Sequence, residues 1–114
     1  MPHIILEVPQ QFDIELAKKV INLAQQFLVE KLPTRLETFK SRVYRYSFSS
    51  VAGDDSLDVI HVQIKVLKGR KPEHLEEISQ QLKAKIRELL NPEVNLDSYS
   101  VTLELMELST AYAN

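Results

Sequence analysis

The chain contains no cysteine. This absence excludes disulfide bonds, thiolate metal sites and a cysteine nucleophile. The chain also has no apolar run approaching the roughly 20 residues that a membrane-spanning helix needs. Its first residues lack the basic start and long apolar stretch of a secretory signal. We therefore expect a cytoplasmic protein with no membrane partner.

Neither sign of charge dominates the sequence. Lysine and arginine number 14 against 16 aspartates and glutamates, for a net charge of −2. A general nucleic-acid binder usually has a clear basic excess, so this balance argues against that class. Hydrophobic residues make up 44% and charged residues 26%, as in ordinary globular proteins. A chain of 114 residues can bury one core but not two, which predicts a single domain over residues 1–114.

Apolar periodicity predicts four strands and two helices. The strands are expected at 3–8, 38–49, 57–67 and 99–108, and the helices at 13–31 and 72–90. Asp13 is a candidate N-cap for the first helix, and Pro72 suits the first position of the second. Residues 52–56 have the composition of a loop, and residues 109–114 read as a tail.

The element order is β-α-β followed by β-α-β, in two units of similar layout at about 2–50 and 57–108. Strands joined through a helix should be parallel, with right-handed crossovers. This order predicts an α+β fold: a four-stranded mixed sheet with both helices on one face. The other face would expose Arg42, Tyr44, Tyr46 and Phe48. Oligomerisation is the simplest way for so small a domain to cover that face.

Pro2 is the residue with the most direct chemical potential. If Met1 is removed, the chain begins with a secondary amine. A free α-amino group titrates at roughly 7.7–8.0, and burial disfavours its charged form. A buried N-terminal proline can thus act as a general base at neutral pH. The alternative is that Pro2 is only a common second residue, and we expect it to open an edge segment that contributes little packing.

Several segments together resemble a known family. They are the opening Met1-Pro2-His3-Ile4-Ile5-Leu6-Glu7, Ser41-Arg42 after the first helix, His61-Val62-Gln63-Ile64-Lys65 leading to Gly69-Arg70, and the final strand 101–108. Over residues 1–108 the chain resembles the 5-carboxymethyl-2-hydroxymuconate Δ-isomerases of the tautomerase superfamily. The second unit, with its strand, Gly-Arg and amphipathic helix, independently resembles a 4-oxalocrotonate tautomerase subunit.

The resemblance implies a homotrimer with inward-facing sheets and a cofactor-free isomerase. Its substrate would be an unsaturated 2-hydroxy or 2-oxo polycarboxylic acid such as 5-carboxymethyl-2-hydroxymuconate. By the same resemblance, Pro2 and Arg70 are the catalytic candidates, and Arg42 and Lys40 the substrate-binding candidates. Lys40 stands where the family more often has arginine, and lysine cannot make the bidentate carboxylate fork that arginine makes. Lys71 stands where tautomerases often have a Ser or Thr helix cap.

Each candidate also has a simpler interpretation. Arg70 could be a solvated charge at a turn, and Arg42 an ordinary residue of the sheet surface or of an interface. The basic and aromatic run at 42–48 is reminiscent of single-stranded nucleic-acid binders, but the acidic balance of the chain argues against that function. His3 and His61 have no further ligand at metal-binding spacing, so we expect no metal site.

The alternative function is a non-catalytic trimeric module on the same scaffold, which would bind a small acid or a partner protein. The two hypotheses differ at the N-terminus. If Met1 is retained, the Pro2 nitrogen is an amide and cannot serve as a base at neutral pH.

Overall fold

The computed structural model describes residues 1–114 and has the predicted order of elements. The strands and long helices are β1 (His3–Pro9), α1 (Ile14–Lys31), β2 (Lys40–Tyr46), β3 (Asp58–Val66), α2 (Pro72–Leu90) and β4 (Tyr99–Glu107). One-turn 3-10 helices, Leu36–Thr38 and Leu96–Ser98, precede β2 and β4. The expected strand at 38–49 was too long at both ends, because a 3-10 turn occupies its start and the chain leaves the sheet after Tyr46.

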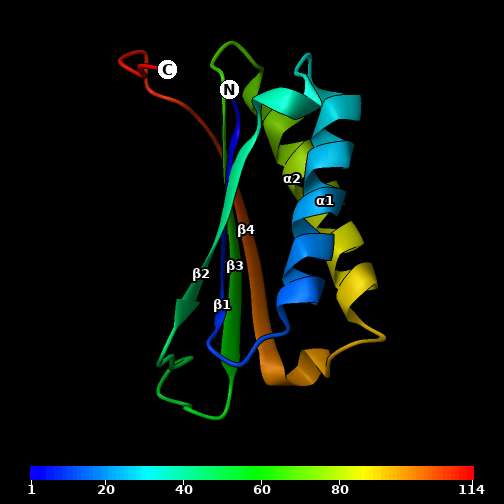
Figure 1. Cartoon of the computed structure of the whole chain (residues 1–114), viewed down its shortest axis with the longest axis vertical. Coiled ribbons are helices and arrows are strands. Elements are labelled where there is room, and N and C mark those ends of the chain that lie inside the picture. The colour runs from blue at the N-terminus through cyan, green and yellow to red at the C-terminus, as the bar shows by residue number, and fades with distance from the viewer.

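The four strands form one mixed sheet in the order β2-β1-β3-β4. The β1–β2 and β3–β4 pairs are parallel, whereas β1 and β3 are antiparallel. Figure 1 shows both helices packed on the same face of the sheet, which leaves the opposite face open. The predicted α+β class and mixed four-stranded sheet are therefore confirmed. The division into two pseudo-repeat units within one domain stays a prediction.

Pro2 precedes a central strand, so the expectation of an edge segment was wrong. β1 lies between β2 and β3, and Pro2 itself is buried. Its carbonyl oxygen accepts a hydrogen bond from the Lys40 backbone nitrogen at 2.9 Å, which extends the parallel pairing by one residue. The physical reason is that the two units join through β1 and β3, which places the N-terminal strand in the middle of the sheet.

The core lies between the sheet and the helices and consists of 20 buried apolar residues. Alternate sheet positions supply one side of it: Ile4, Leu6, Val8, Ile60, Val62, Ile64, Val66 and Val101. The helices supply most of the other: Leu16, Ala17, Val20, Ala24, Phe27, Leu28, Ile78, Leu82, Ile86 and Leu90. Each fully buried leucine or isoleucine stabilises the fold by about 1.5–3 kcal/mol. Strand alternation thus directs these side chains to the core and the intervening ones to the opposite face.

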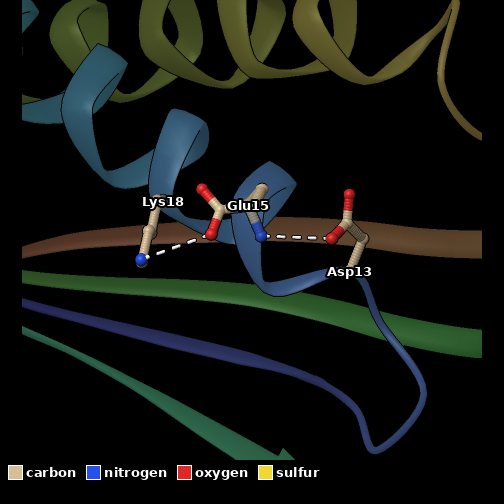
Figure 2. Close-up of polar contacts among 3 residues, drawn as sticks. All are labelled: Asp13, Glu15 and Lys18. Carbon is tan, nitrogen blue, oxygen red and sulfur yellow. Dashed lines mark hydrogen bonds and ion pairs between the residues drawn. The ribbon is translucent and has the colours of Figure 1, made fainter.

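A side-chain cap sets the first turn of α1. The Asp13 carboxylate accepts a hydrogen bond from the Glu15 backbone nitrogen at 3.2 Å (Figure 2). Lys18 pairs with the Glu15 carboxylate at 3.4 Å, but both side chains are more than half exposed. An exposed pair of this kind contributes about 0–1 kcal/mol, whereas an N-cap contributes typically ~1 kcal/mol. The predicted cap at Asp13 is confirmed, and it fixes where α1 begins.

The topology gathers several chain segments at one end of the molecule. β1 and β2 begin there, and α1, β3 and β4 end there, as the ribbon in Figure 1 shows. The turn from β3 into α2 also lies at this end. Residues far apart in sequence, from Pro2 to the C-terminal tail, are therefore neighbours in space. None of the helices has the length and apolar character that crossing a membrane requires.

Candidate active site

A small cavity at this end brings Pro2 and Arg70 together. Its volume is about 20 Å³, room for roughly one water molecule. The residues that line it are Met1, Pro2, Leu32, Pro33, Thr34, Val66, Leu67 and Arg70. The two residues predicted to be catalytic thus lie on one cavity, although 67 residues separate them between positions 2 and 70. Because Met1 also lines the cavity, its removal would both free the proline nitrogen and enlarge the space.

The Arg70 side chain carries an unused hydrogen-bond donor. Its Nε atom is buried and has no hydrogen-bond partner. Buried donors in folded proteins are nearly always paired, so an unpaired one calls for an explanation such as a missing ligand. Arg70 also has no carboxylate within ion-pair distance, since the ion pairs of the chain are Lys18–Glu15 and Arg35–Glu37. Arg70 thus lines the cavity together with Pro2 and carries a donor that no group of the chain satisfies.

The other two predicted site residues lie on β2 beside the N-terminus. Lys40 pairs with His3 in the parallel ladder, and Arg42 pairs with Ile5. Neither lines the Pro2–Arg70 cavity. Both are exposed, and both belong to the open face of the sheet because they alternate with Ser41 and Val43. The structure therefore brings Pro2 and Arg70 together and places Lys40 and Arg42 nearby, on the adjoining face.

His3 links Arg42 to the C-terminal tail. Arg42 Nη1 lies 3.1 Å from His3 Nδ1, and His3 Nε2 lies 2.9 Å from the Tyr112 hydroxyl. Arginine can only donate, so His3 Nδ1 must accept and Nε2 must carry the ring proton. The His3 and Tyr112 rings also meet edge to face, with centroids 5.6 Å apart. The neutral imidazole thus holds the guanidinium of Arg42 on one side and the tail on the other.

Two basic groups at this end have lowered pKa values. Burial lowers the pKa of the Met1 amine, and the positive charge of Lys40 lowers it further. Burial also lowers the pKa of His3, with further contributions from Arg42, Lys40, Lys65 and the N-terminal amine. In both cases, the environment disfavours an additional positive charge. An N-terminal amine in this position is therefore biased toward its neutral form, which is the form that accepts a proton.

Four cations at this end of the molecule have no ion-pair partner. Lys40, Arg42, Lys65 and Arg70 form no ion pair within 4.0 Å. This local excess contrasts with the net charge of −2 for the whole chain. Clustered charge of one sign attracts ligands of the opposite sign. The described side chains form no cluster of three or more potential metal ligands. The arrangement suits a small polyanion beside a neutral amine.

Sequence reasoning missed several residues of this region. It interpreted Leu32-Pro33-Thr34 only as the end of the first helix, yet all three line the cavity. A signal for them existed, because a β-α-β crossover returns the chain to the start of its first strand. Tyr112 was assigned to a tail without a role, and no sequence pattern indicates its hydrogen bond to His3.

Solved structures share this fold. A 5-carboxymethyl-2-hydroxymuconate isomerase from Deinococcus radiodurans R1 superposes with a TM-score of 0.80 at 20% identity, covering 98% of this chain and 86% of that one. A 5-carboxymethyl-2-hydroxymuconate delta-isomerase gives 0.78 at 12% identity, covering 100% and 87%. The F6 fused 4-OT wild type asymmetric trimer gives 0.66 at 18% identity, covering 92% and 86%. The chain therefore has the same fold as these proteins.

The sequence model of the 5-carboxymethyl-2-hydroxymuconate isomerase family matches residues 2–114. The chain belongs to the 5-carboxymethyl-2-hydroxymuconate isomerase family. The resemblance inferred from Pro2, Gly69-Arg70 and the doubled β-α-β order is thus confirmed. A search of curated proteins found no match to this chain.

The position of Lys40 beside the N-terminus predicts a measurable effect on the terminal amine. Replacing Lys40 by Gln should raise the pKa of the Met1 amine, because a nearby positive charge disfavours protonation. The pKa should stay below its ordinary value, since burial is the larger cause. An NMR titration of protein labelled with 15N at Met1 measures the shift. Lys68→Gln removes an exposed lysine at the β3–α2 turn and should leave the pKa unchanged. An equal shift in both variants would contradict the local effect of Lys40.

Proposed function

We propose that this protein is a cofactor-free isomerase that uses Pro2 as a general base once Met1 has been removed. The substrate class is an unsaturated 2-hydroxy or 2-oxo polycarboxylic acid, with 5-carboxymethyl-2-hydroxymuconate as the leading member. The main support for this proposal is that Pro2 and Arg70 line the same cavity. In addition, Arg70 Nε is buried and has no hydrogen-bond partner. Membership of an isomerase family supports the reaction class. The expected cytoplasmic location stays a prediction.

The reaction needs only the movement of one proton. In the proposed mechanism, the neutral Pro2 nitrogen removes a proton from the substrate, and the electron pair left behind delocalises as a dienolate. The Pro2 ammonium then returns the proton to another position of the conjugated system, so that no bond to the enzyme forms and nothing is oxidised or reduced. Positioned general-base catalysis contributes roughly 10²–10⁴-fold. The cavity residue Arg70 is placed to stabilise the oxygen on which negative charge develops.

Lys40 and Arg42 are proposed to bind carboxylates of the substrate outside the cavity. On β2, Lys40 pairs with His3 and Arg42 with Ile5, one and three residues after Pro2, and neither has an acidic partner. His3 accepts a hydrogen bond from Arg42 without neutralising it, which holds the guanidinium in place and keeps its charge. Arg42 can bind a carboxylate through two parallel hydrogen bonds, whereas Lys40 acts as a point charge. The pair therefore provides one directional and one adaptable carboxylate contact.

A homotrimer is part of the proposal because the site of one chain is small and one face of the sheet is uncovered. The cavity of about 20 Å³ cannot hold a muconate-sized molecule while Met1 lines it. On the uncovered face, Tyr44 of β2 is 56% exposed. The fused 4-OT relative is described as a trimer, which supports this assembly. In the proposed trimer, the open faces pack inward and neighbouring subunits complete the walls of the site.

The alternative is a non-catalytic trimeric module that binds a small acid or a protein. The unpaired cations at this end favour it, because they can attract an acid whatever the state of the Pro2 nitrogen. In a protein that retains Met1, the Pro2 nitrogen is an amide with no basic lone pair, while Arg70 and the other cations still attract an acid. The state of the N-terminus therefore separates the two functions.

Removal of Met1 should switch on proton transfer. We expect the processed protein to ketonise 5-carboxymethyl-2-hydroxymuconate, with kcat/KM rising with pH through the pKa of the Pro2 amine, because only the neutral amine accepts a proton. That pKa should lie below the ordinary range for an N-terminal amine, as the lowered pKa of the Met1 amine indicates. Absorbance assays on fractions defined by intact mass provide the measurement.

The matched control is the same protein with Met1 retained. One way to retain it is to insert, between Met1 and Pro2, a residue that prevents removal of Met1. This control should bind substrate more weakly or not at all and should show no proton transfer. Equal turnover by both forms would rule out the proline mechanism, and no turnover by either form would leave the binding module as the better description.

Arg70→Ala should impair turnover far more than it impairs folding. Losing a charged hydrogen bond costs about 1.5–3 kcal/mol, which corresponds to roughly a ten- to hundredfold loss in kcat/KM. Thermal unfolding should change little, because the Arg70 side chain forms no ion pair or hydrogen bond through Nε in the free protein. Lys68→Ala, which removes an exposed cation two residues earlier, should keep wild-type kinetics. Wild-type kinetics for Arg70→Ala would assign Arg70 to the solvated surface.

The proposed assembly predicts three times the monomer mass of 13.1 kDa in solution. Multi-angle light scattering at micromolar concentration tests this directly. Replacing the exposed Tyr44 by Glu should dissociate the assembly, since a carboxylate on an inward-facing sheet would be buried without a partner. A stable monomer for the unmodified protein would contradict the proposed assembly.

A further inference from the structure

The turn that carries Arg70 is tied to the end of β4 by a single carboxylate. Glu107 Oε2 accepts hydrogen bonds from the backbone nitrogens of Gly69 at 2.6 Å and Arg70 at 3.1 Å. Gly69 has a φ of 113°, a conformation that residues with a side chain rarely adopt. This backbone turns two successive N–H groups toward one point, where an anion can bind both. Glu107 supplies that anion from within the chain.

No other side chain performs this task. Glu107 is the only side chain that hydrogen-bonds the backbone of residues 67–71. Lys71, the N-cap residue of α2, makes no capping hydrogen bond with its side chain. A Ser or Thr at that position would normally satisfy a free N–H group of the first helical turn. Glu107 therefore holds the two residues that precede this N-cap, while α2 itself has no side-chain cap.

The backbone of β4 places Glu107 accurately beside the turn. Glu107 is paired with Val66 in the parallel β3–β4 ladder, and the next residue, Leu108, donates its N–H to the Val66 carbonyl at 2.7 Å. Val66 also lines the Pro2–Arg70 cavity. Glu107 and the cavity thus lie at the same end of the sheet. The pairing of β4 with β3 therefore fixes the position of Glu107 relative to the turn.

The contact of Glu107 leaves the charge of Arg70 free. The carboxylate binds the backbone of Arg70 and forms no ion pair with its guanidinium. A carboxylate paired with the guanidinium would compete with an anionic substrate for that group. A carboxylate bound to the backbone instead fixes the position of the Arg70 main chain and leaves the guanidinium available. Arg70 lines the cavity, and its buried Nε has no hydrogen-bond partner elsewhere in the chain.

We propose that Glu107 is a positioning residue that holds Arg70 at the Pro2 cavity through the two backbone hydrogen bonds. This inference rests on the proposed function of Arg70. Glu107 does not touch the substrate; it fixes the turn from which the guanidinium reaches the dienolate oxygen. Displacement of a catalytic group by about 1 Å can cost about a hundredfold in rate. Loss of this tether should therefore reduce activity without removing any group that contacts the substrate.

The first experiment is a double-mutant cycle with the processed protein. Glu107→Ala should lower kcat/KM about ten- to hundredfold, within the range expected for misplacement of Arg70. The same substitution in an Arg70→Ala background should cause no further loss, since there is then no guanidinium to position. Glu107→Gln should recover most of the activity, because its amide oxygen can still accept from both N–H groups. Glu93→Ala removes an exposed carboxylate distant from the turn and should match the wild type.

A second experiment separates positioning from general stabilisation of α2. Introducing Lys71→Ser into the Glu107→Ala variant supplies an ordinary N-cap and should restore the unfolding temperature. It should not restore kcat/KM, because a serine at position 71 cannot bind the amides of Gly69 and Arg70. Recovery of activity together with stability would overturn the positioning role and assign Glu107 to helix capping alone.

The role of Arg70 and the role of Glu107 can be contradicted separately. Wild-type kinetics for Arg70→Ala overturns the proposed function and, with it, the role of Glu107 in catalysis. An impaired Arg70→Ala combined with fully additive effects in the cycle overturns only the positioning role. Amide hydrogen exchange of Gly69 and Arg70 tests the tether without any substrate. Exchange at both amides should accelerate in Glu107→Ala and remain slow in Glu93→Ala; unchanged exchange in Glu107→Ala would overturn the inference outright.

Discussion

The antiparallel pairing of β1 with β3 is the interaction on which the rest of the structure depends. It joins two β-α-β units, places the N-terminal strand in the centre of the sheet and sets Leu6 opposite Val62. In this register, the start of β1 lies beside the end of β3. Pro2 therefore meets the turn that carries Arg70, as the termini and the β3–α2 turn at one end of Figure 1 illustrate. A shift by one residue would turn the apolar side chains of β1 away from the core.

Electrostatic imbalance at this end explains how an acidic chain can attract an acidic ligand. Lys40, Arg42, Lys65 and Arg70 have no ion-pair partners, and the one carboxylate at the β3–α2 turn, Glu107, binds backbone N–H groups instead of a cation. The same positive charges that would bind carboxylates also lower the pKa values of the N-terminal amine and of His3, after the larger effect of burial. Substrate attraction and a neutral base thus have a shared physical cause, since both follow from uncompensated cations beside a partly buried amine.

Much of the site could be predicted from the sequence because its chemistry depends on residue type and chain order. Pro2 after Met1 identifies a possible terminal base, and Gly69-Arg70 before Pro72 identifies a turn with a cation at a helix start. The spacing of apolar residues predicts both helices and the helix-facing side of every strand. Tertiary contacts could not be predicted in the same way. The cavity residues Leu32-Pro33-Thr34 and the hydrogen bonds of Glu107 join segments between 30 and 40 residues apart along the chain.

The sequence by itself determined the order of elements, the two amphipathic helices, the Asp13 cap and the family, because these depend on local periodicity and on motifs within short windows. Only the tertiary structure decided that β1 is central, that Pro2 is buried and shares a cavity with Arg70, and that Lys40 and Arg42 lie on the adjoining face. Strand order and register result from packing two units together through long-range hydrogen bonds and a common core. No local sequence pattern indicates strand order or register. For this reason the N-terminal strand was expected at an edge of the sheet but lies in the middle.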